Sequence, residues 1–297
     1  MTPAEQESFK KWLKGIPYEI KFWQSFYNHR PSLTKLYSWS DYGQRCTLDN
    51  FDVQSFLSAS GSSPLMIDVG CALSYVPGTL FDNAGVRMHL VDPLAVFYNR
   101  ILDKTGSDRM RLKTGMIELL STLYAEGSVD LVHVRNALDH SANPMAGIME
   151  CLQVLRTGGV LYLHHHINEA EREAYRGFHQ YNLDSHDGKL VIWNRTDSID
   201  VAERLKDVAD VRCEILDNTY VIAVIEKKKA LPEPLYDRQE APRRATEMMS
   251  LAIETFNRPG FAFSYNIHKL QAAIAHPLMR RIPRSAVTRL KSLLRPS

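Results

Sequence analysis

The stretch between Leu65 and Asp92 restricts the fold of this chain more than any other. A short apolar run at 65–67 ends in a turn of small residues around Gly70, a helical segment follows, and a second apolar run ends at Asp92. This order predicts a parallel βαβ unit whose first turn lies at the carboxyl edge of the sheet. Asp92 follows Gly70 by 22 residues, close to the spacing of about 20 at which such an acid reaches a bound ribose diol. The stretch therefore predicts a nucleotide or nucleoside site.

The chain after Asp92 continues the alternation of helix and strand. Expected elements are a helix at 95–102, a strand at 110–112, a helix at 117–124, a strand at 128–134, a helix at 144–155 and a strand at 160–163. Gly158 and Gly159 are expected to end the last of these helices. The alternation favours an α/β fold of the Rossmann-like kind, with a doubly wound and mostly parallel sheet.

Two strands without a helix between them are expected near the end of the sheet. Residues 210–216 and 220–226 have strand-like apolar patterns, and turn-forming Asp217 and Asn218 lie between them. Such a short connection joins antiparallel strands. We therefore expect the sheet to end in an antiparallel hairpin.

The sequence divides into three parts. Residues 1–60 are expected to form an N-terminal helical cap, 61–230 the Rossmann-like domain, and 231–297 a proline-marked linker with a basic helical tail. The domain is expected to contain an insertion at 168–200, with a helix at 169–178 and a hairpin turn at Asp187-Gly188. Insertions at the carboxyl edge usually carry substrate choice.

Aromatic residues of the N-terminal cap recur at helical spacing. They are Phe9, Trp12, Phe22, Trp23, Phe26 and Tyr27. Two interpretations are open. The stripe packs into the core, or it forms a lid over the carboxyl edge of the sheet, with rings that stack on an adenine or a sugar.

Composition excludes several classes of protein. The chain has 297 residues, 44% of them hydrophobic, which is ordinary for a globular domain. Its longest apolar runs are far shorter than the ~20 residues of a membrane span. The N-terminus carries acids where a signal peptide has a basic start, so a cytoplasmic location is expected. The 4 cysteines form no C-x-x-C pair, which indicates neither a zinc site nor a disulfide framework.

The net charge of +2 is unevenly distributed. From Leu231 onward there are 11 Lys/Arg against 5 Asp/Glu, and no acid follows Glu254. Apolar residues alternate with arginines over 279–297, so this segment either lies peripherally on an anionic membrane surface, at its inner face, or is a solvated basic tail. Nucleic acid is not expected as a partner, because the basic run lacks interleaved aromatic residues.

The order of elements and the residues at the strand ends together resemble the class I S-adenosylmethionine-dependent methyltransferases. Asp68-Val69-Gly70 matches the first motif of that family, Asp92 its acid on the ribose, 115–118 its adenine-side turn and 129–140 its motif after strand four. The resemblance covers about 64–227 and implies S-adenosyl-L-methionine as the cofactor. The cofactor-binding residues it implies are Asp68, Gly70, Cys71, Ala72, Ser74, Asp92, Pro93, Met116, Ile117, Glu118 and Asn136.

The sequence departs from the motifs of this family at two places. The glycine-rich loop has Ala72 and Ser74 at its usual small positions, and these residues permit close approach less freely than glycine. At the adenine-side turn, Met116 stands where an acid is common. Glu118 then either accepts the exocyclic amine of adenine or only caps the helix that follows.

A narrower resemblance lies in the stretches NALDHSANP, NEAE, HQYNLD and GKLVIWN. They are similar to an uncharacterised bacterial subgroup of the family, whose members belong to surface-polysaccharide or other sugar-modifying pathways. This resemblance implies O-methylation of a sugar or glycan acceptor, and hence a role in polysaccharide biosynthesis.

Methyl transfer to a hydroxyl needs alignment of donor and acceptor and a group that removes the proton. His140 follows the strand at 128–134 and stands beside Asp139. Its unperturbed pKa of about 6.5 suits a general base at neutral pH. Alternatively, His140 closes the loop through a hydrogen bond to the backbone. His165 is the second catalytic candidate.

Three successive histidines directly follow the strand expected at 160–163. Because side chains alternate along a strand, His164 and His166 should share one face and His165 the other. With Asn168 and Glu169 nearby, His164 and His166 either hold a divalent metal or form a polar wall, and we assign no metal. Expected acceptor-binding residues are His164, His166, Asn168, His179, Tyr181 and Trp193.

Three other functions compete with O-methylation of a sugar. The first is methylation of another small metabolite. The second is a non-catalytic S-adenosylmethionine-binding scaffold that regulates a partner, which the degenerate loop and Met116 favour. The third is a nicotinamide-dependent dehydrogenase, which shares the opening βαβ unit but has a fuller glycine fingerprint. The antiparallel hairpin expected at 210–226 argues against the dehydrogenase.

Overall fold

The structure is a computed structural model, and it describes residues 3–29, 48–73, 85–106, 110–175, 177–232 and 240–256. Ser74 and the basic segment 279–297 lie outside the described residues. Among the helices that are described, none combines the length and the apolar character needed to cross a bilayer. The expected boundaries of cap, domain and tail stay predictions.

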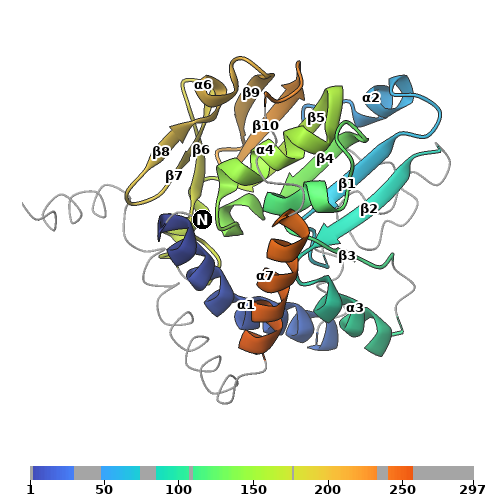
Figure 1. The fold of residues 1–297 in the computed structure, drawn as a ribbon. Coiled ribbons are helices and arrows are strands. Elements are labelled where there is room, and N and C mark those ends of the chain that lie inside the picture. The colour runs from blue at the N-terminus through green and yellow to red at the C-terminus, as the bar shows by residue number, and fades with distance from the viewer. Residues whose placement is uncertain are drawn as a thin grey trace, which may run out of the picture.

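A seven-stranded sheet forms the centre of the molecule (Figure 1), in the order β3-β2-β1-β4-β5-β10-β9. Its strands are β1 Leu65–Val69, β2 Arg87–Asp92, β3 Lys113–Thr114, β4 Val129–Arg135, β5 Leu155–His166, β9 Ala209–Leu216 and β10 Tyr220–Lys227. Strand β10 runs antiparallel to both of its neighbours, whereas β1 to β5 are mutually parallel. The expected Rossmann-like sheet with a final antiparallel hairpin is confirmed.

Helices cover the sheet and its carboxyl edge. They are α1 Pro3–His29, α2 Val53–Ala59, α3 Ala95–Lys104, α4 Pro144–Val154, α5 Glu169–Arg172, α6 Val201–Leu205 and α7 Glu240–Phe256, with short 3-10 helices at Ile117–Thr122 (η2) and Leu138–His140 (η3). All five residues of β1 are buried, as expected for a parallel strand covered on both faces. Helices α1 and α7 lie side by side at the end toward which β1 and β2 point (Figure 1).

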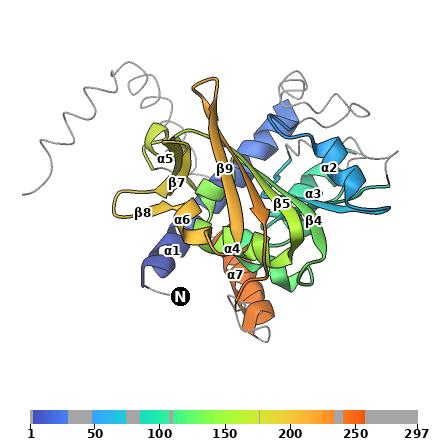
Figure 2. The same ribbon diagram turned by 90° about the horizontal axis from the view of Figure 1, so that it is seen from above.

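A second, three-stranded antiparallel sheet is built by the insertion. It consists of β6 Asn182–His186, β7 Lys189–Trp193 and β8 Ser198–Asp200, and it lies beside β9 on the side away from β4 (Figure 2). The turn between β6 and β7 has positive φ at both Asp187 and Gly188. This is the conformation that tight hairpins require, and it confirms the expected turn.

Three expected elements differ in the structure. The strand expected at 110–112 forms only at β3, because the backbone of Leu112 pairs with the side chain of Asn99 instead of with β2. The glycines at 158–159 do not end α4, which stops at Val154; they form an irregular stretch inside β5, with Gly158 at φ +75°. The helix expected at 169–178 ends at Arg172, because Ala174 and Tyr175 adopt left-handed backbone conformations.

Candidate active site

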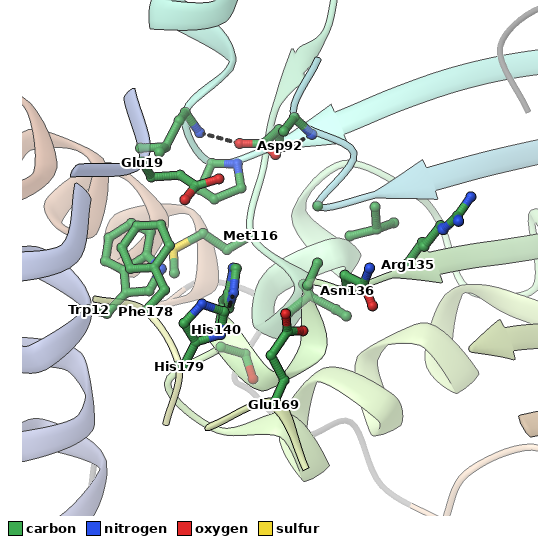
Figure 3. Close-up of a pocket in the computed structure, with 18 of the residues that line it drawn as sticks. Trp12, Glu19, Asp92, Met116, Arg135, Asn136, His140, Glu169, Phe178 and His179 are labelled. Atoms are coloured by element: carbon green, nitrogen blue, oxygen red, sulfur yellow. Dashed lines mark hydrogen bonds between the residues drawn. The ribbon is translucent and has the colours of Figure 1, made fainter. Parts of the chain in front are cut away.

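A cavity of about 910 Å³ opens at the carboxyl ends of β1, β2, β4 and β5 (Figure 3). Ligand sites commonly have volumes of roughly 300–1,000 Å³. The turns after β1 and β2 and the helix η2 form one part of the wall, and the loop after β4 with segment 166–179 forms another. Helix α1 supplies Trp12, Glu19, Phe22 and Trp23. One pocket therefore joins the cap, the sheet edge and the insertion.

The turn after β1 depends on Gly70. Its φ is +68°, and a Cβ there would lie 2.4 Å from the Cβ of Ala137. The Gly70 N–H donates to the Val91 carbonyl at 2.8 Å, which ties the turn to β2. Any larger side chain would push β1 and the loop after β4 apart, so glycine keeps the floor of the cavity open to a ligand.

Asp92 at the end of β2 is buried at the wall of the cavity. Its Oδ2 accepts the Ala72 N–H at 2.9 Å and its Oδ1 accepts the Leu94 N–H at 2.7 Å (Figure 3). Burial raises the pKa of Asp92 to about 7, against the lowering by these two bonds. Each carboxylate oxygen keeps a lone pair, since a carboxylate accepts about four hydrogen bonds. Asp92 is thus fixed in place and still able to accept from ribose hydroxyls.

Asp68 and Cys71 do not line the cavity. The Asp68 carboxylate lies 2.7 Å from Nδ1 of His133, and both side chains are about 2% exposed. Tyr162 stacks on the His133 ring. Asp68 therefore holds β1 to β4 behind the site instead of contacting a ligand with its side chain. Cys71 is buried, and burial raises the pKa of its thiol.

The expected adenine-side turn does border the cavity. Met116, Ile117 and Glu118 line it together with Pro93. Glu118 Oε1 accepts the N–H groups of Ala142 and Asn143 at 2.8 and 3.3 Å. Glu118 therefore caps the loop after β4 instead of its own helix, and its role as acceptor for the adenine amine stays a prediction. Met116 and Ile117 leave an apolar surface at this end.

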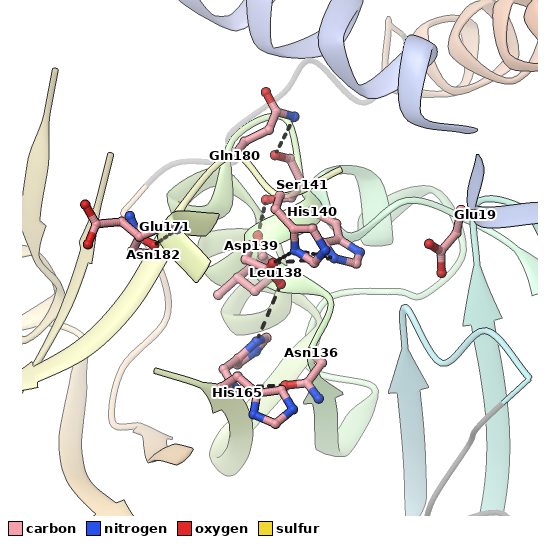
Figure 4. Close-up of polar contacts among 12 residues, drawn as sticks. Glu19, Asn136, Leu138, Asp139, His140, Ser141, His165, Glu171, Gln180 and Asn182 are labelled. Atoms are coloured by element: carbon pink, nitrogen blue, oxygen red, sulfur yellow. Dashed lines mark hydrogen bonds and ion pairs between the residues drawn. The ribbon is translucent and has the colours of Figure 1, made fainter. Parts of the chain in front are cut away.

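On the opposite wall lie His140 and His179 (Figure 3), and Asp139 is buried behind them, next to His140 (Figure 4). His179 Nδ1 lies 2.8 Å from Asp139 Oδ2, and His140 Nε2 lies 3.1 Å from His179 Nδ1 and 3.4 Å from Asp139 Oδ2. Hydrogen bonding to Asp139 raises the pKa of His179 to about 9, against its burial. Burial lowers the pKa of His140. The expected arrangement is an ionised Asp139, a protonated His179 and a neutral His140.

Asp139, His140 and His179 also form a possible set of metal ligands, because each offers one ligand atom and these atoms all lie within 4.8 Å of one another. This set differs from His164 and His166, the two histidines for which the sequence leaves a metal site open. Those two rings do share one face of β5, since both pack against Tyr220. Only His166 lines the cavity, however, and His164 Nε2 lies instead 3.5 Å from a carboxylate oxygen of Asp49.

His165 is not placed to touch an acceptor. Its side chain is 1% exposed, it does not line the cavity, and its Nδ1 lies 3.9 Å from Asp139 Oδ1. Burial lowers the pKa of His165 to about 3, so the ring is neutral. The alternation of β5 turns it toward the back of Asp139, which corrects its assignment as a catalytic residue.

Three expected acceptor-binding residues hold the insertion in place instead. Asn168 donates to Asp184 and accepts from the indole N–H of Trp193 at 3.0 Å. The Tyr181 hydroxyl donates to the Ala142 carbonyl at 3.1 Å. None of Asn168, Tyr181 and Trp193 lines the cavity, because their polar atoms are engaged in fixing β6 and β7. His166 and His179 do line it, as do Gly70, Ala72 and Asn136.

Several lining residues have no counterpart in the expected site. They are Glu19, Tyr98, Arg135, Glu173, Phe178 and Tyr220. Glu169, weighed only beside a metal, also lines the cavity, and burial with the nearby Asp139 raises its pKa to about 7. Arg135 is the last residue of β4, so its position at a strand end was available as a signal. Glu19 lies in a helix far away in the sequence, where no motif marks it.

Residues 67–163 match a protein family described as a methyltransferase domain. The matched residues make up about a third of the chain and are similar to a methyltransferase domain. The cofactor of the chain is S-adenosylmethionine. The domain match begins in β1 and ends in β5, so it includes Gly70, Asp92 and the loop with His140. The match and the sheet with its antiparallel β10 together support a class I methyltransferase.

Similar solved structures include an S-adenosylmethionine-dependent methyltransferase from Aquifex aeolicus, with 12% identity, 71% of this chain and 98% of that chain covered, and a TM-score of 0.41. A protein from Pyrococcus horikoshii OT3 has 15% identity and a TM-score of 0.39, and the match covers 67% of this chain and 98% of that chain. The 16S rRNA N2 G1207 methyltransferase from T. thermophilus has 17% identity, 64% and 42% coverage and a TM-score of 0.37. The search of curated proteins finds no match.

Residues 67–163 include side chains that suit this cofactor. Gly70 gives close access to the backbone, where a Cβ would meet Ala137. Asp92 offers fixed carboxylate oxygens for the ribose, and Met116 with Ile117 offers apolar surface for the adenine. Asn136, at φ +47°, follows β4 at the point where the two walls meet.

Proposed function

We propose that this methyltransferase domain transfers the methyl group to a hydroxyl oxygen of a sugar or glycan acceptor. The observation that carries the proposal is that His140 and His179 line the same cavity as Gly70 and Asp92, with the buried Asp139 behind them. A hydroxyl needs a base during transfer, whereas an acceptor that is already nucleophilic does not. His140, His179 and Asp139 supply a neutral imidazole backed by a buried carboxylate.

His140 is the proposed base. S-adenosylmethionine supplies, when bound, a methyl group on a sulfonium, which is already activated for in-line displacement. Within the described chain, Nδ1 of His140 has no hydrogen-bond partner, and Nε2 faces Asp139 and His179. A proton taken at Nδ1 creates an imidazolium that the Asp139 carboxylate stabilises through Nε2. Asp139 holds the ring in this orientation and does not itself take the proton.

The acceptor end of the cavity is polar and aromatic, which supports a polyhydroxyl ligand. The carboxylates of Glu169 and Glu173 can accept hydrogen bonds from hydroxyl groups, and the Arg135 guanidinium can donate them. Tyr220 and Phe178 offer ring surfaces. This combination favours a sugar over an apolar metabolite, although a small polar metabolite has the same chemistry and is the second substrate class to test.

The decisive experiment is transfer of labelled methyl from S-adenosylmethionine to a panel of acceptors. The panel contains nucleotide sugars, oligosaccharides, catechols and amines, with product mass measured for each. Methylation of a sugar hydroxyl is the expected result. Transfer only to amines, or tight cofactor binding without transfer to any of these acceptors, contradicts the proposal, and the second outcome favours the regulatory scaffold. Binding of NADH in place of S-adenosylmethionine would support the dehydrogenase.

A further inference from the structure

Glu19 of α1 points into the cofactor half of the cavity. Its Oε1 accepts the indole N–H of Trp23 at 2.8 Å, one helical turn further on. Both residues line the cavity, and Glu19 lies across from Asp92 (Figure 3). Within the described parts of the chain, no donor engages the second oxygen, Oε2. The indole therefore fixes the Glu19 rotamer while one oxygen remains available to a ligand.

The position of α1 is itself fixed by close packing. A Cβ on Gly15 would lie 2.2 Å from Cδ1 of Phe178, so only glycine lets the helix approach this ring. Trp12 stacks on the same Phe178 ring, with the two ring centroids 5.7 Å apart and the ring planes nearly parallel. Lys11 Nζ donates to the His179 carbonyl at 3.2 Å. Glu19 is thus carried by a helix that is docked at several points.

The charge of this half of the cavity suits a cationic nucleoside. Its described lining includes the carboxylates of Glu19 and Asp92 and no Lys or Arg; Arg135 lies on the other wall. The two carboxylates are near enough that Glu19 raises the pKa of Asp92, after the larger effect of burial. Two acids facing one space without a basic side chain between them indicate a ligand that brings donors or positive charge.

We infer that Glu19 is a cofactor-binding residue, which accepts a hydrogen bond from the ribose diol of S-adenosylmethionine opposite Asp92. Helix α1, which lies outside the matched residues 67–163, is then part of the cofactor site and not only a cover for the core. The inference rests on the cofactor of the proposed function but not on its acceptor or on His140. Trp23 acts through Glu19 by holding its carboxylate in place.

Calorimetric titration of the full chain with S-adenosylmethionine and, separately, S-adenosylhomocysteine tests this role. Glu19→Gln keeps the size of the side chain and removes its charge, so both dissociation constants should rise about tenfold, the range for losing a hydrogen bond to a charged group. An equal rise for the two ligands is expected, because both contain the ribose, and it shows that Glu19 does not act on the sulfonium charge. A rise for S-adenosylmethionine alone would place Glu19 at the sulfonium and overturn the ribose assignment.

The matched control is Glu7→Gln, an exposed acid on the same helix that pairs only loosely with Lys10, at 3.9 Å. This variant should bind both ligands as the unaltered protein does. Trp23→Phe removes the indole donor and should weaken both ligands about threefold, an effect intermediate between the two variants. Unchanged binding by a folded Glu19→Gln variant would overturn the inference and leave the proposed methyl transfer standing. Weaker cofactor binding by Glu19→Gln, in a protein that transfers methyl to none of the acceptors, would instead leave the inference standing and overturn the proposed function.

Discussion

At the scale of single residues, two buried acids organise the two halves of the cavity by different means. Asp92 is held by backbone N–H groups and has a raised pKa. Asp139 is held by imidazoles, and its coulombic interaction with His140 and its bond to His179 lower its pKa despite burial. Asp92 therefore titrates near neutral pH, whereas Asp139 stays ionised there.

Asp92 should make cofactor affinity depend on pH. Its pKa of about 7 means that the carboxylate, the better acceptor for ribose hydroxyls, becomes populated as pH rises from 6 to 8. Binding of S-adenosylmethionine should tighten over this range, and Asp92→Asn should bind about tenfold more weakly with a flat profile. Calorimetry at three pH values measures both effects. Asp103→Asn, exposed on α3, is the control; a sloping profile in Asp92→Asn would show that another group titrates.

His140 should affect turnover and not cofactor affinity. His140→Ala removes the proposed base, so kcat should fall about 10²-fold or more, as is typical of general-base removal. The dissociation constant of S-adenosylmethionine should stay within about twofold, because His140 belongs to the other wall. Single-turnover kinetics and calorimetry separate the two quantities. The exposed His186→Ala serves as control, and full turnover by His140→Ala would remove His140 from the mechanism.

The pair of His179 and Asp139 should make stability depend on pH. Because the folded pKa of His179 is about 9, above its ordinary 6.5, its contribution is fully present below pH 6.5 and is lost as pH rises through 9. Since His179 is 22% exposed, the loss is about 1–2 kcal/mol of unfolding free energy. Urea denaturation at pH 6.5 and 9.5 measures it. In His179→Gln the difference between these pH values should shrink, and an unchanged difference would assign it to other groups.

At the scale of elements, α1 has two possible roles according to its aromatic residues. They pack into the core, or they cover the site. Phe9, Trp12, Ile16 and Ile20 are buried in a cluster with residues of α3 and η2. Trp12, Phe22 and Trp23 also line the cavity. Both interpretations therefore describe part of the helix, because its inward face meets the core along most of its length and the cavity at the sheet edge. The side chains of Phe26 and Tyr27 lie outside the described residues.

Gly15 should control the docking of α1. In Gly15→Val the new side chain would collide with Phe178, which should cost about 1–3 kcal/mol of unfolding free energy, as overpacked cores do. Cofactor affinity should fall as well, because Glu19 moves with the helix. Urea unfolding and calorimetry measure the two effects. Lys14→Ala, at the exposed neighbouring position, is the control; a Gly15→Val variant as stable and as tight-binding as the unaltered chain would contradict this account.

The strands that contain site residues were the most predictable elements. The ends of β1, β2 and β4 follow from apolar runs closed by polar residues, and the β9–β10 turn follows from Asp217-Asn218, both at φ +51°. The end of α5 was not predictable. Ala174 and Tyr175 adopt left-handed backbone conformations there, and the Tyr175 hydroxyl accepts a hydrogen bond from Asn182 of β6 at 2.9 Å. Such contacts between distant residues leave no periodic pattern in the sequence.

At the scale of the whole molecule, charge is divided between the domain and the end of the chain. Residues from Leu231 onward carry 11 Lys/Arg against 5 Asp/Glu, and the cofactor half of the cavity is acidic. The acidic half of the cavity attracts a positively charged cofactor, whereas the basic end of the chain attracts anionic surfaces. The two parts of the chain therefore have opposite electrostatic preferences.

The basic segment 279–297 gives a prediction that rests on sequence alone. If it lies on anionic membranes, the full chain should sediment with vesicles of phosphatidylglycerol and phosphatidylcholine at low salt and be released at high salt, because attraction between exposed charges is screened. Deletion of 279–297 should abolish sedimentation without changing cofactor affinity. Equal sedimentation of the shortened chain would assign the binding elsewhere, and none by the full chain would leave a solvated tail.

The sequence by itself determined the order of the main strands along the chain, the turn at Gly70 and the acid at Asp92, because each depends on local patterning. It also placed His140 after β4. Tertiary structure decided which side chains meet across the cavity. It brought His179 to Asp139, turned His165 away from the cavity and placed Glu19 opposite Asp92. The physical reason is that these meetings depend on how a long helix and an insertion dock, through shape and hydrogen bonds between residues far apart in the chain.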